Sequence, residues 1–182
     1  MSSSTASCSG KTPNTVGRKT KDMMFLNTFG GNADFVRTLI EAQVEFLVVG
    51  GLAVVFHNCR DPLKVDDLDL LVNPSPENAE RFIQVLSAMQ FDPLPAIAQV
   101  ARSNFQIPIK IIPLFYVDIL TPPDNIDFGE LSSRSESALL QDNIPIQVVS
   151  RWDLIALKQI AIQNLSTDKQ KHEDDLRCLQ AV

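Results

Sequence analysis

The segment Val48–Val72 most constrains the fold of this chain. In it an apolar run stops at a Gly-Gly pair, and a later apolar run carries a cluster of carboxylates. The first run, Val44–Val49, is rich in β-branched residues and stops at Gly50-Gly51. This pattern predicts a buried strand that turns tightly into a helix over Leu52–His57. The second run, Val65–Val72, predicts another strand, one that carries acidic residues. Strands separated by helical segments in this way favour an α/β fold.

Two aspartates share one face of the second predicted strand. Side chains at i and i+2 of a strand project together, so Asp67 and Asp69 point one way while Leu68 and Leu70 point the other. Carboxylates held this close repel, and one takes up a proton unless a cation lies between them. Mg²⁺ or Mn²⁺ suits such hard oxygen ligands and a phosphate-bearing substrate. The pattern therefore predicts a metal site, with solvated acids on a half-exposed strand as the alternative.

A third carboxylate and the glycine pair extend this predicted site. Asp118 lies in another apolar run, Leu114–Leu120, and joins the first two aspartates if the strands are neighbours. Three aspartates on adjacent strands would hold metal ions for an in-line phosphoryl or nucleotidyl transfer. Gly50-Gly51 lets the backbone approach a phosphate closely, and the following helix directs free N–H groups toward it. A tight turn without a ligand is the alternative interpretation of the glycines.

The rest of the chain continues the alternation of helices and strands. Pro108 restricts its strand to a sheet edge, and Ser150 with Asp153 forms a capping-box pattern at the start of a helix. Further helices are predicted over Asn32–Gln43, Glu77–Met89, Phe128–Leu140, Ser150–Leu165 and Thr167–Gln180, and further strands over Phe105–Pro113 and Ile144–Val149. We predict one α/β (α+β) domain over residues 21–182, with a mixed β-sheet of about four to six strands flanked by helices.

Composition and charge limit the partners of the chain. The hydrophobic content of 45% and charged content of 21% are those of a globular protein. The net charge is 16 − 22 = −6, so nucleic acid would need a local basic surface, with the tail and the Lys158, Lys169 and Lys171 region as candidates. No apolar run reaches the roughly 18 residues that cross a bilayer.

The N-terminus and the cysteines indicate a compartment. Residues 1–20 are rich in Ser and Thr, basic, and lack an apolar secretory segment, which predicts a disordered tail. Cys8, Cys59 and Cys178 are odd in number and follow no metal-ligand spacing, so we expect free thiols in a reducing compartment. The expected location is cytoplasmic.

Five other side chains have competing interpretations. His57 is expected to be a hydrogen-bonded structural histidine rather than a base, and Trp152 a packing anchor at a helix start. Lys158 either extends to the surface from its apolar surroundings or belongs to the site. Arg60 and Lys64 are either phosphate partners or exposed loop charges.

The order of these motifs resembles the nucleotidyltransferase superfamily of the DNA polymerase β type, and within it the small bacterial proteins grouped with AbiEii-like toxins. The similarity covers Phe25–Leu179. It is carried by "VEFLVVGGLAVVFH", "DDLDLLVNPSPENAERF", "YVDILT", "VSRWDLIALKQIA" and "HEDDLRCL". Relatives have His-Gly-x-x-Arg-x-Thr before the acidic strand, whereas this chain has Asn58 for the glycine and a longer connection. A late R-x-K-D-x-x-D of relatives is replaced by "KQKHEDD", with Lys169 and His172 as the changed residues.

The resemblance implies an enzyme that moves an NMP from an NTP to an acceptor hydroxyl on RNA such as tRNA, on a protein or on a small molecule. It implies these roles: triphosphate contacts for Gly50 and Gly51, Mg²⁺ or Mn²⁺ ligands in Asp67 and Asp69, a third ligand or base in Asp118, phosphate neutralisation by Lys158, and support of the site by Asp175. A toxin–antitoxin partner is a further implication. The alternative is a non-catalytic nucleotide-binding or antitoxin-like module on the same fold.

Overall fold

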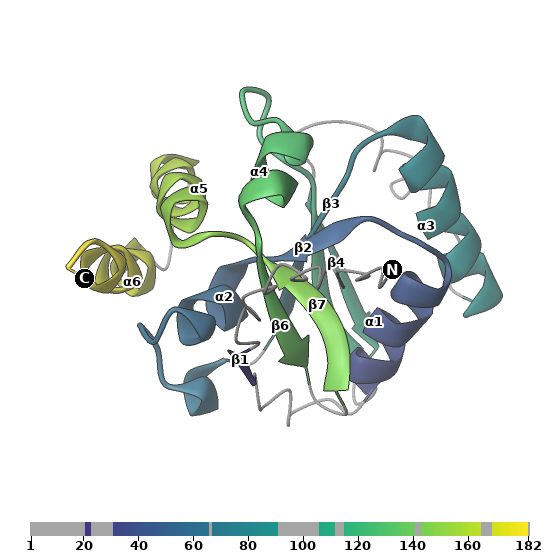
Figure 1. Cartoon of the computed structure of the whole chain (residues 1–182), viewed down its shortest axis with the longest axis horizontal. Coiled ribbons are helices and arrows are strands. Elements are labelled where there is room, and N and C mark those ends of the chain that lie inside the picture. Colours follow the sequence, from purple (N-terminus) through teal and green to yellow (C-terminus); the bar gives the residue numbers. More distant parts are fainter. Residues whose placement is uncertain are drawn as a thin grey trace, which may run out of the picture.

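The structure, a computed structural model, describes residues 21–22, 31–65, 67–90, 106–111, 115–140, 143–164 and 169–181. In Figure 1 a central mixed sheet lies between two groups of helices. The predicted α/β class with a mixed sheet is confirmed. The predicted tail, residues 1–20, lies outside the described residues.

The sheet has seven strands in the order β1-β6-β7-β2-β3-β5-β4. They are β1 (Lys21–Asp22), β2 (Phe46–Val48), β3 (Leu68–Val72), β4 (Gln106–Ile111), β5 (Phe115–Leu120), β6 (Glu136–Leu140) and β7 (Ile144–Val148). Strand β3 is antiparallel to β2 and parallel to β5, and β2 is parallel to β7. The strand that contains Pro108, β4, forms an edge of the sheet, as predicted. Strands β1 and β6 are not predicted by the sequence patterns, and they raise the number above the expected range.

The helices in the described residues cover both faces of this sheet. They are α1 (Gly31–Glu41), α2 (Gly50–Phe56), α3 (Pro76–Ala88), α4 (Phe128–Arg134), α5 (Arg151–Asn164) and α6 (Lys169–Gln180), with a 3₁₀ turn, η1, at Pro62–Lys64. Figure 1 shows α1 and α3 on one side of the strands and α2, α5 and α6 on the other. Ser75 caps α3, since its hydroxyl oxygen accepts a hydrogen bond from the Asn78 N–H.

One predicted helix, Phe128–Leu140, is wrong in its second half. Helix α4 ends at Arg134, Ser135 has an extended backbone, and Glu136–Leu140 pairs with β7 as an antiparallel strand. Ala138 and Leu140 are buried while Ser137 and Leu139 are more exposed, so the segment fits the half-buried surface of a sheet. Strand pairing with β7 overrides a local pattern that favours a helix.

The core fixes the strands that carry the predicted metal ligands. Leu68 and Leu70 of β3 are fully buried, and Phe35 of α1 and Phe82 of α3 are also without exposed area. Each such side chain stabilises the fold by about 1.5–3 kcal/mol relative to an exposed one. Asn32 also anchors α1 to β5, because its amide exchanges two hydrogen bonds with the backbone of residue 116. Burial of the leucines holds β3, which carries Asp69, in place, and the Asn32 hydrogen bonds do the same for β5, which carries Asp118.

Candidate metal site

The predicted neighbourhood of three aspartates is present at the centre of the sheet. Asp69 of β3 is directly paired with Asp118 of β5, and these strands are parallel, so their side chains share a face. Asp67 lies two residues before Asp69 and is carried to the same face. One carboxylate oxygen from each residue lies within 4.8 Å of the others, and all three side chains are partly buried. The prediction that the strand of Asp118 lies beside β3 is confirmed.

Burial and mutual repulsion perturb the central carboxylate of this cluster. The pKa of Asp69 is raised from 3.8 to about 6, chiefly by burial and next by the charge of Asp67, with a smaller contribution from Asp118. The Gly51 N–H donates a hydrogen bond of 3.2 Å to Asp69 Oδ2, and this bond and the charge of Lys158 oppose the rise. A bound cation would relieve the same repulsion.

The three carboxylates fit a hard divalent cation. Their oxygens converge from β3, β5 and the residue just before β3, and within the described residues no nitrogen or sulfur ligand joins the cluster. Mg²⁺ takes a few carboxylates and completes its shell with water and substrate phosphates, and Mn²⁺ accepts the same oxygen donors. The donors present therefore match Mg²⁺ or Mn²⁺.

Gly50 is the residue that allows α2 to approach the cluster. Its φ is +59°, and a Cβ built on it would lie 1.7 Å from Asp69 Oδ2 and 2.6 Å from Asp69 Cβ. A side chain at this position would therefore occupy the space of Asp69. Gly51 is similarly close to Arg60, since its Cβ would lie 2.7 Å from Arg60 Nη1. The predicted contact of both glycines with a triphosphate stays a prediction.

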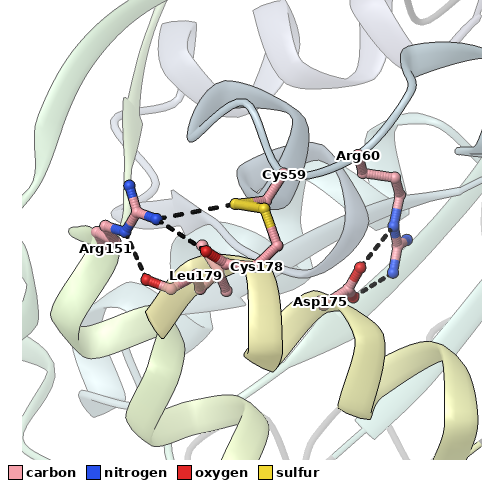
Figure 2. Close-up of a disulfide and its surroundings, with 6 residues drawn as sticks. All are labelled: Cys59, Arg60, Arg151, Asp175, Cys178 and Leu179. Carbon is pink, nitrogen blue, oxygen red and sulfur yellow. Dashed lines mark hydrogen bonds and ion pairs between the residues drawn. A yellow bond between two sulfur atoms is a disulfide. The ribbon is translucent and has the colours of Figure 1, made fainter. Parts of the chain in front are cut away.

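A second polar group, the cation network, comprises Arg60, Lys158 and Asp175. Lys158 Nζ of α5 lies 2.7 Å from Asp175 Oδ2 of α6, and Arg60 Nε donates to Asp175 Oδ1 at 3.0 Å. Arg60 Nη2 also contacts Asp175 Oδ2 (Figure 2). The exposed fractions of these side chains are only 5% for Lys158, 5% for Asp175 and 8% for Arg60. The interpretation in which Lys158 extends to the surface is therefore wrong.

The cation network is electrostatically coupled to the aspartates. Burial lowers the pKa of Lys158, and the hydrogen bond and charge of Asp175 oppose that change. The ammonium of Lys158 in turn lowers the pKa of Asp69. His172 of α6 lies near the network, and burial followed by the Lys158 charge lowers its pKa. His172 Nδ1 is buried without a hydrogen-bond partner in the described part of the chain.

The structure corrects the prediction of free thiols for two of the three cysteines. Cys59, just after α2, and Cys178 of α6 form a disulfide whose Cα atoms are 5.5 Å apart. Residues 119 positions apart in sequence are joined by the fold, and no spacing rule in a single chain reveals such a pair. Cys8 lies outside the described residues. The predicted cytoplasmic location stays a prediction.

The predictions for His57, Trp152, Arg60 and Lys64 also have clear outcomes. His57 Nε2 lies 3.0 Å from the Val149 carbonyl oxygen, which confirms a structural histidine that joins α2 to the end of β7. Trp152 is 80% exposed, so its predicted role as a packing anchor is wrong. Arg60 is buried, whereas Lys64 is exposed as one of its interpretations expects.

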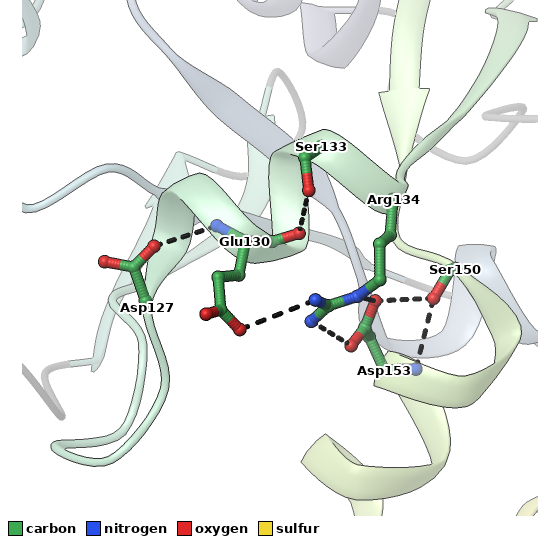
Figure 3. Close-up of polar contacts among 6 residues, drawn as sticks. All are labelled: Asp127, Glu130, Ser133, Arg134, Ser150 and Asp153. Carbon is green, nitrogen blue, oxygen red and sulfur yellow. Dashed lines mark hydrogen bonds and ion pairs between the residues drawn. The ribbon is translucent and has the colours of Figure 1, made fainter.

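The start of α5 has the predicted serine cap, and a neighbouring arginine strengthens it. The Asp153 N–H donates to Ser150 Oγ at 3.2 Å, and Ser150 Oγ donates to Asp153 Oδ2 at 2.5 Å. Arg134 at the end of α4 forms a bidentate pair with the Asp153 carboxylate, as Figure 3 shows. Asp127 caps the opposite end of α4 through the Glu130 N–H. These contacts fix the start of the helix that carries Lys158.

The raised pKa of Asp69 predicts a pH dependence of stability in the metal-free protein. The folded state holds this proton more tightly than the unfolded chain, so the free energy of unfolding should fall as the pH rises from about 4 to about 6. The total is about 3 kcal/mol, at about 1.4 kcal/mol for each pH unit between the two pKa values. Urea unfolding of the wild type and Asp69→Asn at several pH values measures this contribution. A difference between the two proteins that does not change with pH would contradict it.

The mixed sheet matches a nucleotidyltransferase-like fold, and its three clustered aspartates, Asp69 and Asp118 on adjacent strands and Asp67 just before β3, could hold a metal ion. A solved structure with this fold is an antigenic nucleotidyltransferase-like protein from Paracoccidioides brasiliensis. The match has a TM-score of 0.51 and 11% sequence identity, and it covers 81% of this chain and 72% of that chain. At this identity the similarity establishes the fold.

The sequence comparisons give no narrower assignment. No protein-family model and no curated protein matches the chain. The predicted AbiEii-like subgroup and toxin–antitoxin partner therefore stay predictions. Among the described helices, none has the length and apolar character needed to cross a membrane.

Proposed function

We propose that this chain is a metal-dependent nucleotidyltransferase that moves an NMP from an NTP to an acceptor hydroxyl. The observation that carries the proposal is the convergence of Asp67, Asp69 and Asp118 on one face of a nucleotidyltransferase-like sheet. Three partly buried carboxylates within 4.8 Å of one another destabilise a metal-free site, so a purely structural role gives no reason for them.

The aspartates would bind Mg²⁺ or Mn²⁺, and one of them would accept the proton of the acceptor hydroxyl. When bound, the metal supplies positive charge that polarises the phosphate and acidifies the acceptor hydroxyl. Asp67 and Asp69 are the principal ligands in this proposal. Asp118, paired with Asp69 across β3 and β5, acts as the third ligand or takes the proton of the attacking hydroxyl.

The cation network would balance the charge of the triphosphate. Arg60 and Lys158 carry two positive charges and Asp175 one negative, which leaves one net positive charge beside the aspartates. Lys158 is the phosphate-neutralising residue in this proposal, and Asp175 holds it in place. Gly50 and Gly51 would allow the triphosphate to reach the backbone next to the metal ligands. In-line positioning of acceptor and NTP supplies the rest of the catalysis.

The acceptor belongs to one of three classes: RNA, protein or small molecule. Lys158 is buried, so it adds nothing to a basic surface for RNA. Lys169 and Lys171 of α6 are exposed, so these two lysines remain available to form such a basic surface. A protein or small-molecule acceptor needs no such surface.

Transfer of label from an NTP tests the proposal. The purified protein would be incubated with each α-³²P-labelled NTP, Mg²⁺ or Mn²⁺, and a lysate that contains RNA, protein and small molecules. We expect labelled acceptor with the wild type and none with Asp67→Asn/Asp69→Asn, because the variant has lost two metal ligands. Asp34→Asn is the matched control, since Asp34 is exposed on α1, on the other side of the sheet from α2 (Figure 1).

The alternative is a nucleotide-binding module without transferase activity. The changed loop after α2 favours it, although Asn58 has a φ of +60°, a conformation that asparagine tolerates almost as glycine does. Asparagine therefore suits the left-handed backbone at this position. Metal-dependent stabilisation by NTP without label transfer would support this alternative. Absence of both signals would contradict any nucleotide site.

A further inference from the structure

Helix α6 is attached to the domain by few apolar contacts. Its sequence, "KQKHEDDLRCLQ", is mostly charged, and Asp175 and Leu179 are its only fully buried residues. Arg151 of α5 binds the end of the helix by donating to the carbonyl oxygens of Cys178 at 3.2 Å and Leu179 at 2.7 Å. Leu179 belongs to the hydrophobic core and the partly buried Leu176 packs against it, and α6 is further attached by the Cys59–Cys178 disulfide and the ion pairs of Asp175. The position of α6 therefore depends on polar contacts and one covalent bond in addition to these two leucines.

The disulfide and the cation network join the same two segments of chain. Arg60 directly follows Cys59, and Asp175 precedes Cys178 by three residues, about one helical turn. Figure 2 shows both connections running from the segment after α2 to successive turns of α6. Arg60 also lies close to the glycine turn beside Asp69, because a Cβ built on Gly51 would lie 2.7 Å from Arg60 Nη1.

We propose that the Cys59–Cys178 disulfide is a redox-controlled strap, and that its reduction releases α6 and weakens NTP binding. The functional half of this inference rests on the proposed nucleotidyltransferase site. Both cysteines are partly exposed, so a reductant can reach the bond. Other sites in the described chain lack a comparable link between a covalent bond and the candidate site.

The chemistry is thiol–disulfide exchange with a dithiol reductant. One thiolate of the dithiol attacks a sulfur of the Cys59–Cys178 bond and forms a mixed disulfide, and the other cysteine leaves as a thiolate. The second thiol of the reductant then displaces the remaining cysteine. Two electrons and two protons pass to Cys59 and Cys178, and the dithiol becomes a disulfide.

Release of α6 would alter the site through Lys158. This ammonium is buried beside Asp175, and a buried cation that loses its counter-ion either turns toward water or gives up its proton. Either change removes the Lys158 ammonium, the proposed phosphate-neutralising group, from the neighbourhood of Asp69. An NTP with its negative phosphates would then bind less tightly.

Hydrogen exchange tests the strap without reference to activity. The full chain carrying Cys8→Ser, which leaves a single cysteine pair, would be measured oxidised and after dithiothreitol treatment. We expect amide exchange in α6 to accelerate by at least about tenfold on reduction. Cys59→Ala/Cys178→Ala should match the reduced protein and should not respond to dithiothreitol. Equal exchange in α6 in the oxidised and reduced proteins would overturn the proposal.

Two more measurements separate the strap from the proposed function. Acylation of Lys158 by an amine reagent, read by mass spectrometry, should be faster in the reduced protein. Affinity for a non-hydrolysable NTP analogue with Mg²⁺ should fall by about tenfold, the size of a typical coupling between sites. Faster acylation with unchanged NTP affinity would overturn the link to the site. If neither state binds the analogue, the proposed function fails, and the exchange and acylation results still decide whether the strap operates.

Discussion

Asp175→Asn is expected to lower the free energy of unfolding by about 3–5 kcal/mol, because it leaves Lys158 and Arg60 buried without a carboxylate. The exposed fractions of the Lys158 and Asp175 side chains are both 5%, so solvent cannot replace the lost interaction cheaply. Asparagine keeps the size of the side chain, removes the charge and replaces one accepting oxygen with an NH₂ donor. Urea unfolding at pH 7, followed by circular dichroism, measures the loss.

Two controls separate the buried charge from a general sensitivity of α6. Asp174→Asn changes the preceding residue, which is exposed and paired with Arg177, and it should alter stability little. Lys158→Met/Asp175→Leu removes one cation together with the carboxylate, and it should cost less than the sum of the two single changes. A loss below about 1 kcal/mol for Asp175→Asn would contradict a buried ion pair.

Gly50→Ala is expected to destabilise the protein by about 3 kcal/mol and to abolish its stabilisation by Mg²⁺. The left-handed backbone at φ +59° costs a residue with a Cβ about 1–2 kcal/mol, and overpacking typically adds about 1–3 kcal/mol. The new methyl group would overlap Asp69 Oδ2 and Cβ, so Asp69 must leave its position in the cluster. Thermal unfolding with and without Mg²⁺ measures both effects.

Gly129→Ala is the matched control for this change. Gly129 is exposed on α4, and an added Cβ would meet only Asp127 Oδ1 at 3.0 Å. This variant should retain stabilisation by Mg²⁺. If Gly50→Ala also retained it, the close packing of Gly50 against Asp69 would not matter for metal binding, and the proposed geometry of the site would be wrong.

The metal cluster is the part of the site that the sequence predicts best. The i, i+2 spacing of Asp67 and Asp69 fixes a common face in any strand, and an apolar run of the right length makes Asp118 a candidate for the next strand. The pairing of β3 with β5, which brings Asp118 to this face, is a contact between distant segments that the structure supplies. Helices with strong periodicity and caps, such as α1 and α3, were equally predictable because their signals are local.

Other features required long-range contacts and could not be predicted from local patterns. The segment Glu136–Leu140 becomes a strand because β7 pairs with it, and Trp152 is exposed because no element covers it in the described structure. The role of Lys158 was ambiguous in sequence, and the position of Asp175 on α6 decides it.

The sequence by itself determined the acidic face, the glycine turn and the succession of strands and helices apart from β1 and β6, since each depends on residues a few positions apart. Only the tertiary structure decided that Cys59 meets Cys178 and that Arg60, Lys158 and Asp175 form one buried network. These contacts join residues up to 119 positions apart, and their formation depends on how α5 and α6 pack against the segment after α2. Periodicity and capping report local backbone preferences, whereas burial of charge and disulfide geometry follow from the packing of distant segments.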